Sequence, residues 1–241
     1  MSIAISCFLA SILASPAHAE EAGKSAKTNR SFEIYIETNF IDQPDFSCYG
    51  AKKLRVIYRR AFWEKREDRQ QLPNKQRVID FAKKKYGDYT GLLVPDIEHW
   101  KLGGSDTQVC ESVQKLVTVL EWIKSGAPKA KVGYYGRPPK PDKRAKLDPS
   151  HRRYKEWQQH NDKLTPLAKA QDALFPVMYT ATDNRELWVK VAVRQISEAK
   201  RLGKGKPVYG FINPFYHNVA AAREIRRKPI HEITFCCNLR P

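Results

Sequence analysis

One stretch of the chain begins apolar and ends acidic: Gly91-Leu92-Leu93-Val94-Pro95-Asp96-Ile97-Glu98-His99-Trp100. Residues 91–94 predict a short buried strand, because the apolar run is too brief for a helix and is bounded by Gly and Pro. If the backbone stays extended, Asp96 and Glu98 point to the same side. Neighbouring carboxylates resist joint ionisation, so one of them tends to keep a proton near neutral pH, as a general acid must. The alternative is a strand end with two solvated carboxylates and a Trp packing nearby.

The segments around this strand alternate between strand and helix patterns. Strands are expected at 31–37, 54–58, 131–135, 173–179, 207–212 and 232–237, and helices at 74–86, 106–125, 151–172, 183–202 and 219–227. Continuous apolar strands are typical of a parallel sheet covered by helices. About seven or eight strands favour an α/β fold, a TIM-type (β/α) barrel. Residues 136–150, between the strand at 131–135 and the helix at 151–172, are rich in Pro, Lys and Arg and predict a loop. The loop is long for a connection, and long loops often have a function.

The N-terminal residues predict export. An apolar segment, residues 3–14, is followed by Ser15-Pro16-Ala17-His18-Ala19, a cleavage site of the A-x-A type. We therefore expect a signal peptide, residues 1–19, cleaved after Ala19, and a secreted or periplasmic protein. Residues 20–30 are a polar, flexible lead-in, and residues 31–241 form a single barrel domain. The mature chain has no apolar run of ~18 residues, so no transmembrane segment is expected.

The charge of the chain points to acidic partners. Lys and Arg number 43 against 26 Asp and Glu, a net charge of +17. In an exported protein this excess favours binding to an acidic polymer or an anionic surface, although it also serves solubility. The basic run from Arg137 to Lys155 is either a solvated loop or a lip that attracts a polyanion.

The cysteines leave their pairing open. Four remain after signal removal, namely Cys48, Cys110, Cys236 and Cys237. Export permits disulfides and four cysteines allow three pairings, of which the adjacent one is strained. The chain has no Cys-x-x-Cys, no His/Cys spacing suited to zinc and no Gly-rich nucleotide motif, so we expect neither a metal nor an organic cofactor. The oligomeric state is not indicated by the sequence.

Polar and aromatic residues follow several predicted strands, where the site of such a barrel gathers. Besides the two carboxylates, these strand ends carry Trp100, Tyr134, Tyr135, Tyr179, Tyr209, Asn213 and Tyr216. Aromatic faces stack on sugar rings and hydroxyls orient them, so the set predicts a sugar site. Each Tyr could instead be a rim residue with its hydroxyl bound to the backbone, but several strand ends agree. His99 is either a partner of a carboxylate or a structural group.

The motif Val-Pro-Asp96-Ile-Glu98-His-Trp100 resembles a strand motif of the hyaluronidase family of glycoside hydrolases. Further similar segments are Gly133-Tyr-Tyr-Gly136-Arg-Pro-Pro, Asn161-Asp-Lys-Leu, Asp172-Ala-Leu-Phe-Pro-Val-Met-Tyr179 and Gly205-Lys-Pro-Val-Tyr209. The resemblance covers residues 32–216. The strand ends are also similar to those of chitinases that use substrate assistance and share the barrel.

The resemblance implies a (β/α)-barrel glycosidase without an enzyme nucleophile, acting on a polysaccharide that contains N-acetylhexosamine. It implies that Glu98 protonates the leaving oxygen. Asp96 would orient the acetamido group of the substrate, which attacks the anomeric carbon, and Tyr179 would support that group. The other aromatic residues and Asn213 at the strand ends are expected to bind substrate.

Two departures from the family pattern keep other functions open. His99 stands where the family has a second Glu, and residues 223–241 lack the apolar residues, Trp and Gly of the family's last strand. The second departure leaves it open whether the last strand completes the barrel. One alternative is therefore a catalytically inactive barrel that binds carbohydrate, and another is a basic protein that binds polyanions. The sequence specifies neither the sugar nor the linkage.

Overall fold

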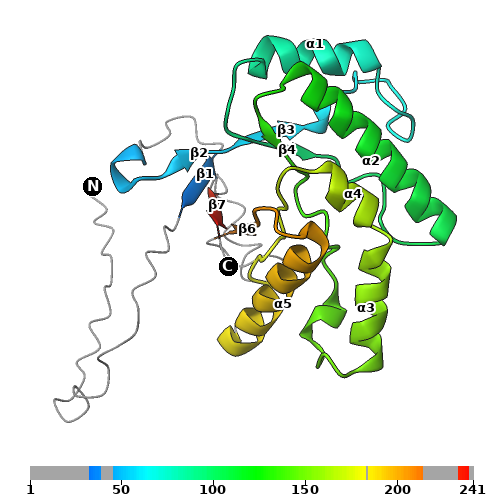
Figure 1. Ribbon diagram of the computed structural model, residues 1–241, viewed down its shortest axis with the longest axis vertical. Helices are drawn as coiled ribbons and strands as arrows, with labels where there is room; N and C mark the ends of the chain where they lie inside the picture. The colour runs from blue at the N-terminus through cyan, green and yellow to red at the C-terminus, as the bar shows by residue number, and fades with distance from the viewer. Residues whose placement is uncertain (1–32, 39–45, 183, 214–232, 239–241) are drawn as a thin grey trace. The chain divides into compact units, whose positions relative to one another are not determined.

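The computed structural model describes residues 33–38, 46–182, 184–213 and 233–238 (Figure 1). These ranges belong to one structural unit, Phe32–Pro241. The expected signal peptide, the lead-in, the helix at 219–227 and Tyr216 lie outside the described residues.

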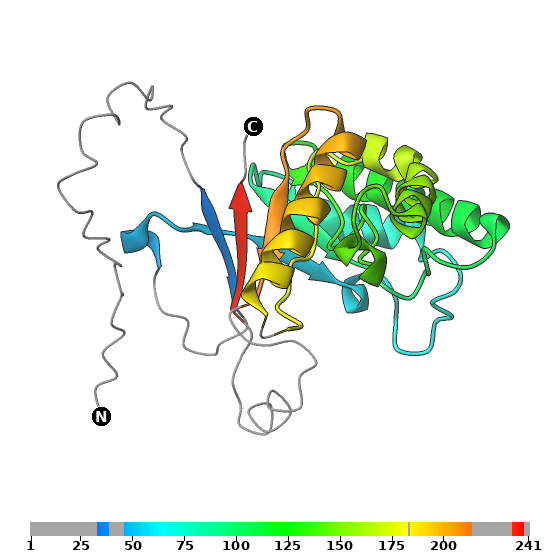
Figure 2. The ribbon, with the colours of Figure 1, turned by 90° about the horizontal axis from the view of Figure 1, so that it is seen from below.

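Strands of the described ranges form two sheets. The first has the order β2-β1-β7-β6 and contains β1 (Ile34–Thr38), β2 (Lys52–Lys53), β6 (Tyr209–Ile212) and β7 (Ile233–Asn238). The second has the order β3-β4-β5 and contains β3 (Arg55–Tyr58), β4 (Leu92–Asp96) and β5 (Lys131–Val132). The second sheet is parallel, as its continuous apolar strands predict. β7 runs antiparallel to both β1 and β6, and Figure 2 shows it beside β1.

The expected barrel is found in part: the fold is mixed α/β, but the two sheets are not closed into a barrel. The expected strand at 173–179 forms isolated bridges in place of a regular strand, and these bridges link Tyr135 to Phe175, Leu174 to Val208 and Val177 to Phe211. Pro176 has no N–H to give to a ladder, which accounts for the irregular pairing at this point. The expected strand at 54–58 is also divided between sheets, because Leu54 donates its N–H to the Ile36 carbonyl whereas β3 pairs with β4.

Three of the helices begin after a capping residue, two of them at the expected position. α1 (Lys75–Tyr86) follows Asn74, whose side chain accepts the Arg77 N–H, and α2 (Asp106–Gly126) follows a capping box of Ser105 and Gln108. α5 (Arg185–Gly203) is capped by Asn184, one residue later than the expected start at Asp183. Short 3₁₀ helices lie at η2 (Ser47–Tyr49), η3 (Arg59–Ala61) and η4 (Lys143–Lys146).

The single helix expected at 151–172 is divided into α3 (Arg152–Asp162) and α4 (Thr165–Ala170). Pro166 accounts for the division, because it lacks an N–H and fits only the first turn of a helix, where it now lies. In the described ranges no helix combines the length and the apolar character that a membrane span requires.

The core lies on both faces of β4. Leu93 packs with side chains of α1 and α2, whereas Leu92 and Val94 pack in a second cluster with Phe175 and Phe211. Alternate residues of a strand face opposite sides, so the even-numbered positions of β4 face the second cluster. This alternation sets the direction of the carboxylate that ends the strand.

Candidate active site

Asp96 continues the face of β4 that carries Leu92 and Val94, and Glu98 follows two residues later, after the end of the strand. Asp96 ends the strand and is half-buried, Ile97 between the two acids is buried, and Glu98 is exposed. β4 ends at Asp96, so strand alternation does not extend to Glu98, and the prediction that the two carboxylates share a side stays a prediction. Burial, and then the charge of Glu98, raise the pKa of Asp96 to about 6.

The Asp96 carboxyl is also incompletely hydrogen-bonded. Its Oδ1 is buried and has no hydrogen-bond partner among the described residues. The resemblance assigns proton donation to Glu98, which lies at the more exposed position. A half-buried Asp96 with an unpartnered oxygen is suited to accept a hydrogen bond from a substrate group that enters the site.

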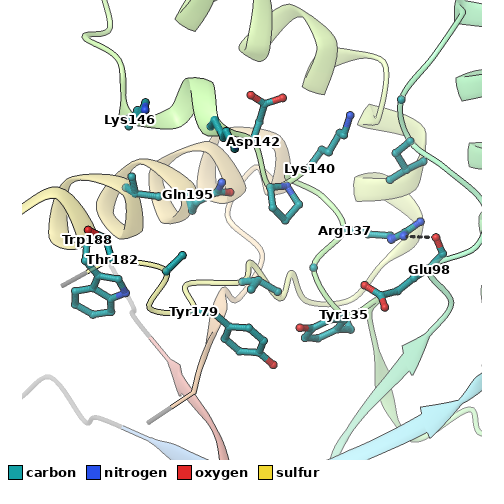
Figure 3. A pocket seen from close by; sticks show the side chains of 18 of the residues that line it. Glu98, Tyr135, Arg137, Lys140, Asp142, Lys146, Tyr179, Thr182, Trp188 and Gln195 are labelled. Carbon is teal, nitrogen blue, oxygen red and sulfur yellow. Dashed lines mark hydrogen bonds between the residues drawn. The ribbon is translucent and has the colours of Figure 1, made fainter. Parts of the chain in front are cut away.

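Glu98 lies at one side of a pocket of about 880 Å³ (Figure 3). Four parts of the chain supply the lining: the segment after β4, residues 135–146, residues 177–182, and α5. The lining includes Glu98, Lys101, Tyr135, Arg137, Lys140, Asp142, Lys143, Lys146, Tyr179, Thr182, Leu187, Trp188, Val191 and Gln195.

Two of the predicted tyrosines meet in this pocket. The ring centroids of Tyr135 and Tyr179 are 6.2 Å apart, and both side chains line the cavity. Figure 3 shows the two hydroxyl-bearing rings beside each other, with Tyr135 on the side of Glu98. Burial, the neighbouring Tyr179 and a hydrogen bond with it raise the pKa of Tyr135. Tyr135 thus keeps its hydroxyl proton beside Tyr179 and within reach of the charge of Glu98.

Four predicted substrate-binding residues do not line the pocket. Tyr134 is fully buried and donates its hydroxyl to the Leu116 carbonyl at 2.8 Å. The strand expected at 131–135 ends as β5 at Val132, and of the two tyrosines that follow only Tyr135 reaches the cavity. Trp100 is buried and donates its indole N–H to the Arg69 carbonyl at 2.9 Å.

The remaining two lie in or beside the second cluster. Tyr209 is buried and stacks on Phe175, with the ring centroids 5.5 Å apart. Asn213 is buried at the position after β6. The aromatic strand-end residues therefore divide between the site and the core.

The basic loop 136–150 lies at the pocket, as the polyanion-lip interpretation expects. It contributes Arg137, Lys140, Lys143 and Lys146 to the lining. The loop is held by α3, because Trp157 donates its indole N–H to the Lys140 carbonyl at 3.1 Å and Asn161 accepts the Lys140 N–H at 3.1 Å. Lys140 is thus carried on anchored backbone.

Arg137 joins this loop to the carboxylate segment. It donates to the backbone carbonyl oxygens of Glu98, at 2.9 Å, and Trp100, at 2.6 Å. Its carbonyl accepts from the buried amide of Gln171, at 2.9 Å. The arrangement fixes the segment 98–100 relative to the loop.

Sequence reasoning missed the side of the pocket that α5 forms, with Leu187, Trp188, Val191 and Gln195. The helical periodicity places Trp188 among the inner positions of this helix. The position of Trp188 in the sequence could have indicated its role, because it lies in the first turns of α5, shortly after the strand-end Tyr179.

The other predicted polar groups are not assembled into a metal site. Within the described ranges, no group of three His, Cys, Asp or Glu side chains could hold a metal ion. Burial lowers the pKa of His99, whose ring lies edge-on to Trp63 with the centroids 4.9 Å apart. Cys48 and Cys110 are exposed, and the disulfide pairing expected for the exported chain stays a prediction.

The fold is similar to that of bee venom hyaluronidase. A crystal structure of that enzyme in complex with a hyaluronic acid tetramer is 16% identical, with a TM-score of 0.50, and the match covers 68% of each chain. A monoclinic crystal structure of the enzyme is 15% identical, with a TM-score of 0.48, over 67% of this chain and 68% of that one. No protein-family model and no curated protein matches the chain. The resemblance to hyaluronidases is thus confirmed for the fold, which by itself does not fix function.

Proposed function

We propose that this protein is an exported glycoside hydrolase that cleaves an anionic polysaccharide containing N-acetylhexosamine. The observation that carries the proposal is the position of Glu98 beside Tyr135 and Tyr179 in a pocket lined by cations. Asp96 does not line this pocket, but it lies near enough to Glu98 for the charge of Glu98 to raise its pKa. A hyaluronidase-like fold supports it.

In the proposed reaction, Glu98 gives its proton to the glycosidic oxygen as the bond from that oxygen to the anomeric carbon breaks. The carbonyl oxygen of the substrate's own acetamido group forms the new bond to that carbon. Asp96 accepts a hydrogen bond from the acetamido N–H, and Tyr179 donates one to the same group. Water then opens the cyclic intermediate and returns a proton to Glu98.

The lining of the pocket supports an anionic substrate. Five cationic side chains line it, namely Lys101, Arg137, Lys140, Lys143 and Lys146. Beside Glu98, the other acidic lining residue is Asp142, which is already bound by Arg144 at 2.9 Å. In the part of the chain that the structure describes, none of the four lysines forms an ion pair. Their charge therefore attracts carboxylate or sulfate groups of a polymer.

The test is the release of reducing ends from hyaluronan, chondroitin and chitin oligosaccharides by the mature chain and its Glu98→Gln variant. This change keeps the shape of the side chain and removes its proton, so turnover should fall at least ~100-fold. Glu156→Gln is the matched control, because Glu156 lies on α3 outside the pocket lining, where it pairs with Arg152. Equal turnover by the parent and Glu98→Gln contradicts the proposed acid.

A carbohydrate-binding protein without turnover is the second candidate, and the sheets that do not close into a barrel favour it. Binding of oligosaccharide by a folded parent that releases no reducing ends would establish this function. A third outcome would indicate a basic polyanion-binding protein. In that case the protein would bind any polyanion, whatever its sugar, and the affinity would fall steeply as the salt concentration rises.

A further inference from the structure

The pocket extends well beyond the carboxylates. Figure 3 shows Glu98 and Trp188 at opposite sides of it. Its volume of about 880 Å³ lies at the upper end of the range of roughly 300–1,000 Å³ found for ligand pockets. The cavity thus has space beside the reacting sugar, and α5 lines that space.

Gln195 on α5 has an unsatisfied acceptor at this pocket. The residue is 2% exposed, and its side-chain oxygen Oε1 is buried without a hydrogen-bond partner in the described part of the chain. A buried amide oxygen that forms no hydrogen bond destabilises the folded protein, and such groups call for an explanation. Because Gln195 also lines the cavity, a rotation of its side-chain amide would present this oxygen to a donor on a bound ligand.

Trp188, two turns earlier on the same helix, is fixed in place. Its indole N–H donates to the Met178 carbonyl at 2.9 Å, and the half-buried ring lines the cavity. The indole nitrogen is therefore already used, and what the ring offers a ligand is its apolar surface. Such a surface suits the apolar face of a sugar ring.

We propose that Gln195 and Trp188 form a second sugar-binding subsite, separate from the one at Asp96 and Glu98. Trp188 stacks on a neighbouring sugar of the polysaccharide, and Gln195 accepts a hydrogen bond from a hydroxyl or N–H of that sugar. The inference rests on the proposed function, because it takes the ligand to be the same polysaccharide.

The experiment is calorimetric titration of the Glu98→Gln chain, which does not cleave, with a hyaluronan octasaccharide. Adding Gln195→Met keeps the length of the side chain and removes the acceptor, so the affinity should fall about three- to tenfold. Trp188→Ala should cause a loss of similar size, whereas Trp188→Phe, which keeps an aromatic face, should stay within about twofold. Gln114→Met, at an exposed position of α2 outside the lining, is the matched control.

The melting temperature of Gln195→Met distinguishes a role of Gln195 in ligand binding from a role in stabilising the fold. Since the Gln195 oxygen is unpartnered in the free protein, Gln195→Met should unfold at the same temperature or a higher one. A lower melting temperature together with unchanged affinity would overturn the subsite. Unchanged affinity in both Gln195→Met and Trp188→Ala overturns it while leaving the proposed function intact. If the Glu98→Gln chain binds no oligosaccharide at all, both proposals fail together.

Discussion

The guanidinium group of Arg137 holds the backbone of Glu98, with 2.9 Å between its Nη2 and the Glu98 carbonyl oxygen. The same group reaches the Trp100 carbonyl oxygen through Nη1, so one planar side chain fixes both ends of a short segment. The ammonium of a Lys is a point donor and cannot reproduce this fork. Placement of the Glu98 side chain therefore depends on Arg137.

We expect Arg137→Lys to lower kcat/KM on oligosaccharides at least about tenfold, because small displacements of a catalytic group are costly. The measurement is initial-rate kinetics beside a thermal melt that verifies folding. Arg152→Lys, at an exposed position on α3, is the control and should leave the rate unchanged. A parent-like rate in Arg137→Lys would show that the segment is held by other contacts.

The raised pKa of Asp96 predicts how stability depends on pH. The folded chain keeps this proton up to about pH 6, whereas the unfolded chain loses it near about pH 4. Between these values the folded state binds more protons, so the free energy of unfolding falls as pH rises. In Asp96→Asn this contribution is absent, so the melting temperature of the variant relative to the parent should increase from pH 4 to pH 7.

Glu37 provides a control for that experiment. Burial raises its pKa to about 7, although the charge of Arg55 opposes the shift, and Glu37 does not line the pocket. Glu37→Gln should therefore also increase the relative melting temperature, over a window that reaches about pH 7. Its pH–rate profile should match that of the parent, whereas Asp96→Asn should change the profile. The same effect on the rate in both variants would contradict a specific role for Asp96.

Two tyrosines separate stability from activity. Tyr134→Phe removes a buried hydrogen bond to the Leu116 carbonyl and should lower the free energy of unfolding by about 1 kcal/mol while activity is retained. Tyr179→Phe removes a hydroxyl at the pocket and should lower kcat while stability changes little. Denaturant unfolding and initial rates, measured on both variants, check the pair. Activity lost in Tyr134→Phe without loss of stability would contradict its placement.

The lysines of the loop predict a salt-dependent affinity. Lys143→Gln should weaken the binding of hyaluronan about two- to threefold at low salt and by less at high salt, because exposed charges are screened. Lys84→Gln removes an equal charge from an exposed position on α1 and is the control. Fluorescence titration at two ionic strengths compares them. Equal losses in both variants would mean that net charge, rather than the pocket, attracts the polymer.

Local signals in the sequence predicted the parts of the fold that local forces determine. The caps at Asn74 and Ser105 set the starts of α1 and α2, and the run after Gly91 is the buried strand β4. The pairing of distant strands was not predictable in this way. The antiparallel direction of β7 and the two separate sheets depend on contacts between segments far apart in the chain.

The candidate site was likewise predictable only in the parts that local sequence determines. The apolar run before Asp96 was enough to place this carboxylate at the end of a buried strand, whereas the strand alternation that would also orient Glu98 stops at Asp96. For an aromatic residue at a strand end, the sequence does not indicate whether the side chain enters the core or the pocket. Tyr134 is in the core, whereas Tyr135 lines the pocket. Trp188 was missed because its position in the helical pattern is equally typical of a core residue.

The pairing of β1 with β7 bears on how the protein is made. Ile34 pairs with Cys237, a sequence separation of roughly 200 residues, and contacts this distant form slowly. A ribosome delivers β1 roughly 200 residues before β7, so this edge of β1 has no partner while the residues between them are made. An unpaired strand edge invites association with other chains. Yield in an expression host should therefore respond to chaperones that cover nascent strands.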